Sequence, residues 1–197
     1  SAALIVLGFG LGIVPNNAMI YFLIGWAIAV VISPFARQSL KFVPLLITLL
    51  VAASVFTPNL LWNAQHGFQT LSHTADNANW GAELLNPNEL WEFFSAQFGV
   101  AGPFLFGALL AGLFTLKKRT LKAGADASKN TMLLAFILPP LMIICTQALL
   151  SRAHANWAMT AYPAAMILLP AWWRHTKARW VLPASLCLHT LLGLFFM

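Results

Sequence analysis

The chain has 197 residues, of which 60% are hydrophobic and only 8% charged, with a mean hydropathy of +0.78. Soluble domains carry about 25% charged residues, so a water-soluble core could not bury this much apolar surface and lipid is the expected solvent. The formal net charge of +6 would suggest nucleic acid in a soluble protein. Here the cations cluster in short loops between apolar runs, as in membrane proteins. We therefore expect no nucleic-acid partner.

Apolar runs of helical length, separated by turn signals, predict an all-α integral membrane fold. The first run is too short to cross about 30 Å of hydrocarbon, and the last run ends in apolar sequence. We therefore expect residues 1–197 to be one membrane domain and a piece of a longer protein. The architecture expected is a polytopic helical bundle with about six full transmembrane helices and a partial one. The partial span covers residues 2–14, and the full spans cover residues 18–33, 42–61, 96–116, 131–150, 157–173 and 180–197.

The cations predict the orientation of this bundle. Ten of the 11 Lys and Arg residues fall in loops 34–41, 117–130 and 174–179, and Arg152 is the exception. By the positive-inside rule these three loops are cytoplasmic, and the expected location is the bacterial inner membrane, crossed several times. Orientation gives Arg152 no role, so this arginine needs a separate explanation.

The long outer loop, residues 63–95, contains one helix signal of its own. Asn86, Pro87 and Glu89 place a capping residue, a proline and an acid where the first turn of a helix prefers them. The aromatic residues that follow predict a short helix in the outer membrane interface. The stretch Gly99–Pro103 then permits a bend before the next span.

Two outer segments carry polar residues that a purely structural account does not require. The guanidinium of Arg152 suits a phosphate group, although an arginine at this place can also anchor the chain to lipid headgroups or a helix end. Both readings stay open. The candidate substrate- and phosphate-binding residues are Asn63 and His66 in the first segment and Arg152, His154, Asn156 and Trp157 in the second.

The metal signal is weak. His66 is a candidate ligand, and together with His154 and Asp76 or Glu83 it could hold a divalent ion, but no pair has the spacing of a zinc motif. Each histidine also has a structural interpretation as a hydrogen-bonding group. The cofactor is therefore left unassigned, with a divalent metal as one option.

At these segments the chain resembles bacterial membrane glycosyltransferases of the GT-C type, the relatives of protein O-mannosyltransferases and of the aminoarabinose transferase that modifies lipid A. Residues 58–68, PNLLWNAQHGF, are similar to the family's P-x-x-x-W-N-x-x-H-G-W stretch. Residues 97–106 are similar to its next span. Residues 152–162, RAHANWAMTAY, are similar to its R-x-x-x-N-W-x-x-x-A-Y signature. The three motifs follow one another in the family's order.

The resemblance implies a GT-C fold with a periplasmic active site. Such enzymes are inverting: an acceptor hydroxyl, deprotonated by a carboxylate base, attacks the sugar of a polyprenyl-phosphate carrier, and the carrier phosphate leaves. The implied partners are a polyprenyl-phosphate-linked sugar donor and membrane lipid. The family's catalytic aspartate would lie upstream of Ser1, so the catalytic residue of this chain is unknown.

A second function class stays open. The chain also departs from the family at residues 15–18, PNNA, where a lysine that could contact phosphate is often present. This departure, and the expected position of the catalytic base upstream of Ser1, favour an alternative function. The alternative is a non-catalytic membrane module that binds or moves a lipid-linked saccharide, or a scaffold subunit.

Overall fold

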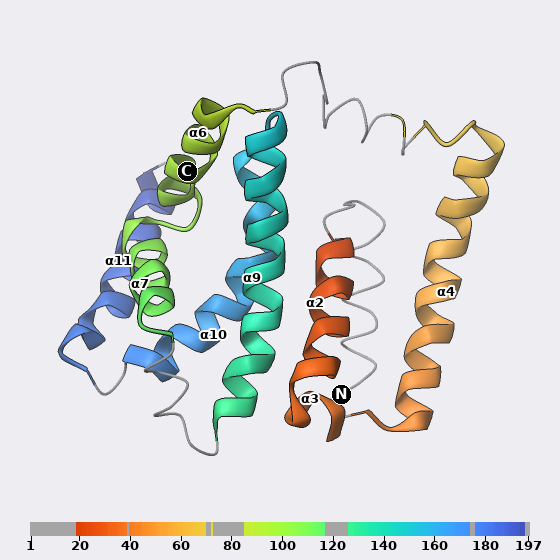
Figure 1. Cartoon of the computed structure of the whole chain (residues 1–197), viewed down its shortest axis with the longest axis horizontal. Coiled ribbons are helices and arrows are strands. Elements are labelled where there is room, and N and C mark those ends of the chain that lie inside the picture. The colour runs from red at the N-terminus through yellow and green to blue at the C-terminus, as the bar shows by residue number, and fades with distance from the viewer. Residues whose placement is uncertain are drawn as a thin grey trace.

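The computed structural model describes residues 19–38, 40–69, 72, 85–116, 126–173 and 176–195. Over these residues the fold is all-helical with no strand, as the sequence predicts (Figure 1). The predicted partial span 2–14, the segment 73–84 of the outer loop and most of the inner loop 117–130 lie outside the described residues. The helices are α2 (Met19–Ile32), α3 (Pro34–Gln38), α4 (Phe42–Gln65), α6 (Pro87–Val100), α7 (Pro103–Phe114), α9 (Ala127–Leu150), η2 (Ala155–Ala161), α10 (Tyr162–Trp173), η3 (Lys177–Trp180) and α11 (Val181–Phe195).

Helix α9 is the centre of the fold. It packs against α2, α3, α6, η2 and α10, and Figure 1 shows it between α2 on one side and the group of α6, α7, α10 and α11 on the other. Its side chains Ile137 and Ile144 are fully buried. Ile137 belongs to a core shared with α7 and α10, and Ile144 to a second cluster with α6 and η2. Both clusters of buried residues are therefore built around α9.

Helix α9 also meets the requirements of a membrane span. Among the described residues it is the one helix that is long and apolar enough by itself, and its 24 residues cover about 36 Å at 1.5 Å per residue. Pro139 and Pro140 lie inside it, which membrane helices tolerate because neighbouring groups satisfy the freed backbone carbonyls. The predicted span 131–150 lies within this helix.

The predicted span over residues 96–116 is not one continuous helix, and the bend expected at Gly99–Pro103 is present. Helix α6 continues to Val100, and α7 starts at Pro103 after a bend of 118°. Gly102, between the two helices, has a φ of 80°, a backbone conformation that glycine adopts without steric cost. The Gly99–Pro103 signal thus marked a full break of the helix, and α6 and α7 meet the length and apolarity requirement only as a bent pair.

The predicted number of six spans is not confirmed. A straight span needs roughly 20 residues, whereas the described parts of α2 and α11 have 14 and 15 residues. Helix α10 has 12 residues, because the first part of the predicted span 157–173 folds as the 3₁₀ helix η2. Helix α4 covers the whole predicted span 42–61 and extends to Gln65.

The cations of the described helices gather at one end of the molecule. Helix α3, which carries Arg37, and the starts of α4 and α9, which carry Lys41 and Lys129, lie at the lower edge of Figure 1. The ends of α4 and α9 lie at the upper edge, where Arg152 follows α9. At the lower end, the Ser33 hydroxyl donates to the Ser128 carbonyl over 2.7 Å and joins α2 to α9.

Candidate functional site

The Arg152 segment turns the chain from α9 into η2. The Ser151 N–H donates to the Gln147 carbonyl over 2.9 Å. The Gln147 side-chain amide in turn donates to the Arg152 carbonyl over 3.1 Å. The backbone at Arg152 is therefore held by the last turns of α9, while the side chain is exposed. Within the described residues no hydrogen bond or ion pair engages the guanidinium, which has five N–H donors.

The other candidates of this segment lie within one turn of Arg152. The Trp157 N–H donates to the His154 carbonyl over 3.0 Å, and the two rings meet edge to face with centroids 5.2 Å apart. Asn156 is exposed between them. The structure thus brings Arg152, His154, Asn156 and Trp157 together, and it gives the His154 ring a packing role.

Two buried polar side chains, Gln97 and Tyr162, support the Arg152 segment through hydrogen bonds. The Tyr162 hydroxyl donates to Gln97 Oε1 over 2.6 Å. Gln97 Nε2 donates to the carbonyls of Phe93 and Ala155, over 3.0 Å and 3.1 Å. Gln97 is 1% exposed and Tyr162 7% exposed, so each depends on the other for its hydrogen bond. Through Ala155 the pair fixes η2, and with it the Arg152 segment, against α6.

Sequence reasoning did not single out Gln97 and Tyr162 as site residues. Both fall inside the stretches that carry the family resemblance, and that shared membership was the signal available. Polar residues inside apolar helices are costly unless they are paired, which is the physical reason for suspecting that two such residues meet. Their separation of 65 positions hid the pairing.

The start of α6 is tied to the same end of α9. The Asn86 N–H donates to the Leu149 carbonyl over 2.7 Å, and Asn86 Nδ2 donates to the Leu150 carbonyl over 3.5 Å. Asn86 is the residue before the helix and Pro87 begins it, as the sequence predicts, but the Asn86 side chain makes no capping bond to α6. It instead satisfies α9 carbonyls that have no partner within their own helix.

Asn63 and His66 lie at the end of α4. Asn63 is buried, and its carbonyl accepts from the N–H groups of His66 and Phe68. His66 Nδ1 bonds the Trp62 carbonyl at 2.7 Å, and the two rings stack with centroids 4.3 Å apart. Local bonds therefore account for one nitrogen of His66 and one face of its ring.

The two predicted segments share one end of the molecule but are separate in space. The end of α4 and the end of α9 both lie at the upper edge of Figure 1, with α2 between the two helices. The structure therefore brings the Arg152 group together and leaves Asn63 and His66 on a different helix. Among the described residues, no group of three or more His, Cys, Asp or Glu side chains is placed to hold a metal ion. Asp76 and Glu83, the proposed acidic ligands, lie outside the described residues.

Cys145 and Cys187 are both free thiols.

The chain is similar to a glycosyltransferase. The lipid A galacturonosyltransferase RgtD of Rhizobium johnstonii is 37% identical over 190 residues, which are 96% of this chain and 38% of the relative. The similarity supports a glycosyltransferase family, while the chain spans well under half of the relative's length. No protein-family model matches the chain, and no solved structure matches it.

Proposed function

We propose that this chain is the membrane part of a glycosyltransferase of the GT-C type, which moves a sugar from a polyprenyl-phosphate carrier to an acceptor at the periplasmic face. The observation that carries the proposal is the 37% identity to a lipid A galacturonosyltransferase along almost the whole chain. The relative's name supports a galacturonosyl group as the sugar and lipid A as the acceptor.

In this proposal the Arg152 segment binds the carrier phosphate. When the sugar leaves its carrier, negative charge grows on the phosphate oxygens, and a preplaced cation stabilises that charge. The exposed Arg152 guanidinium has the geometry for two parallel hydrogen bonds to phosphate. His154, Asn156 and Trp157 line the same turn and offer the sugar polar and aromatic contacts. The carboxylate base comes from the remainder of the full-length protein.

The membrane setting is part of the proposal. Helices α9 and α4 are the proposed straight spans, and α6 lies in the outer interface before α7 turns into the membrane. Loops 34–41, 117–130 and 174–179 face the cytoplasm of a bacterial inner membrane. The placement of Arg37, Lys41 and Lys129 at one end of the molecule supports this orientation.

The test is sugar transfer by the full-length protein from a lipid-linked donor, with Arg152 replaced. A hydrogen bond to a charged group contributes about 1.5–3 kcal/mol, so Arg152→Ala should lower kcat/KM about 10- to 100-fold. Arg152→Lys should recover part of the loss, because lysine keeps the charge and loses the forked geometry. Lys41→Ala, which removes an exposed cation at the other end, is the matched control.

Two outcomes would contradict the proposal at different levels. Wild-type kcat/KM in Arg152→Ala would remove the phosphate role from Arg152 and leave the activity intact. Absence of transfer by the wild-type protein, with the lipid-linked donor still bound, would instead favour a non-catalytic saccharide-binding module.

A further inference from the structure

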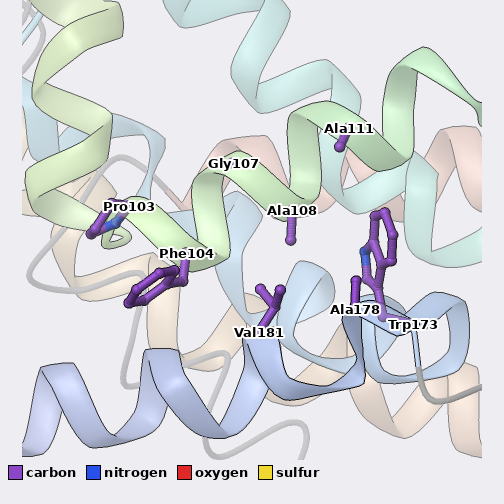
Figure 2. A pocket seen from close by; sticks show the side chains of 8 residues that line it. All are labelled: Pro103, Phe104, Gly107, Ala108, Ala111, Trp173, Ala178 and Val181. Carbon is purple, nitrogen blue, oxygen red and sulfur yellow. The ribbon is translucent and has the colours of Figure 1, made fainter. Parts of the chain in front are cut away.

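An apolar groove of about 300 Å³ lies between α7 and the start of α11. None of its lining residues belongs to the Arg152 segment. Figure 2 shows Phe104, Gly107 and Ala111 of α7 on one side, and Trp173, Ala178 and Val181 on the other. Its lining has almost no polar surface. The volume is at the lower end of the roughly 300–1,000 Å³ of ligand pockets, which suits a single hydrocarbon chain.

One end of the groove is flanked by cations. Ala178 lines the groove beside Trp173, and its neighbours Lys177 and Arg179 are both exposed. Within the described part of the chain, neither cation has an ion pair or a side-chain hydrogen bond. The opposite end is formed by Pro103 and Phe104.

Trp180 follows Arg179 in the chain and reaches the Phe104 end of the groove. Its indole is 56% exposed and meets the Phe104 ring edge to face with centroids 5.9 Å apart. Tryptophan is enriched at the headgroup level of membranes, where its apolar body and its polar N–H are both accommodated. Two exposed cations and an exposed indole on η3, next to an apolar groove, have the composition of a headgroup site beside an acyl-chain site.

We propose that this groove binds one anionic phospholipid, with an acyl chain between α7 and α11 and the headgroup phosphate on Lys177 and Arg179. This inference rests on the proposed membrane location and not on sugar transfer. The cations belong to the loop assigned to the cytoplasmic side, so the lipid comes from the inner leaflet. Phosphatidylcholine carries the same phosphate, but its choline cation offsets that charge, so it gains less from the two cations than an anionic lipid does.

Lipid binding to the full-length protein in detergent, measured by native mass spectrometry, tests the proposal with phosphatidylglycerol and phosphatidylcholine of identical chains. Gly107→Leu places a side chain in the groove, and a Cβ at Gly107 meets nothing within 4 Å, so the helix accepts the change. We expect it to weaken binding of both lipids at least tenfold. The matched control is Gly99→Leu, because a Cβ at Gly99 on α6 also meets nothing within 4 Å.

The charges are tested separately. A cation near a membrane surface contributes about fivefold to the binding of anionic lipid, so Lys177→Gln with Arg179→Gln should weaken the binding of phosphatidylglycerol about 25-fold and weaken that of phosphatidylcholine much less. Lys41→Gln is the control cation. Wild-type binding in Gly107→Leu would overturn the acyl-chain site. An unchanged preference between the two lipids in the double variant would overturn the headgroup site. Neither result depends on catalytic activity.

Discussion

At the scale of single residues, the hydrogen bond between Tyr162 and Gln97 decides how firmly the candidate site is held. The bond is 2.6 Å long and lies between two helices of the core. Gln97 uses its amide group for the Phe93 and Ala155 carbonyls, so its Oε1 depends on the Tyr162 hydroxyl. Loss of that hydroxyl leaves a buried acceptor without this donor, which costs more than the bond itself contributes.

We therefore expect Tyr162→Phe to lower the stability of the protein by about 1–3 kcal/mol. The measurement is the apparent Tm of the detergent-solubilised protein. Tyr21→Phe is the matched control: Tyr21 is half-buried and touches the core that contains Phe93, but the described residues give its hydroxyl no hydrogen bond. An equal decrease of the apparent Tm in Tyr162→Phe and Tyr21→Phe would contradict the role given to the Tyr162 hydroxyl.

At the scale of elements, the break between α6 and α7 is stabilised by a contact with α11. A Cβ on Gly102 would overlap Cε1 of His189. The His189 ring is held in turn by its Nδ1, which bonds the Ser185 carbonyl at 2.8 Å. Gly102 therefore satisfies two requirements, a positive φ and the close approach of an imidazole.

Gly102→Ala should destabilise the protein, by about 1–3 kcal/mol for the backbone conformation alone and by a further amount for the overlap with His189. Adding His189→Ala should relieve the overlap and recover only part of the apparent Tm. Gly99→Ala serves as the control, because that glycine is helical with open space around it and should gain roughly 0.5–1 kcal/mol. A full recovery in the double variant would show that the conformation of Gly102 carries no cost.

Some of these elements could be predicted from the sequence and others could not, for physical reasons. Helix α9 could be predicted because a long apolar run can only be a helix in lipid. The break at Gly102 was signalled by glycine and proline, but its angle depends on the packing of α7 against α10 and α11, which has no local signature. The Arg152 turn was found by a charge in an unusual place, whereas the Gln97–Tyr162 pair that supports it joins residues far apart in the sequence.

At the scale of the whole molecule, the distribution of charge gives the two ends different roles. The lower end in Figure 1 carries Arg37, Lys41 and Lys129, and the Lys129 ammonium is paired with Asp126 at 2.9 Å. The upper end carries Arg152, with its carbonyl fixed and its side chain exposed. A surface pair such as Lys129–Asp126 contributes little to stability, and Arg37 Nη1 donates to the Val30 carbonyl near the end of α2 over 3.2 Å. In the proposed membrane orientation this lower end faces the cytoplasm.

This orientation predicts opposite accessibility for the two ends. In a full-length protein without other cysteines, Asn156→Cys should react with a membrane-impermeant maleimide in intact spheroplasts. Lys129→Cys should react only after the membrane is permeabilised. Both positions are exposed, so a difference in labelling reports the side of the membrane and not burial within the fold. Labelling of Lys129→Cys alone in intact spheroplasts would invert the topology. It would place Arg152 in the cytoplasm, where a periplasmic donor could not reach it, and would therefore contradict the proposed function together with the orientation.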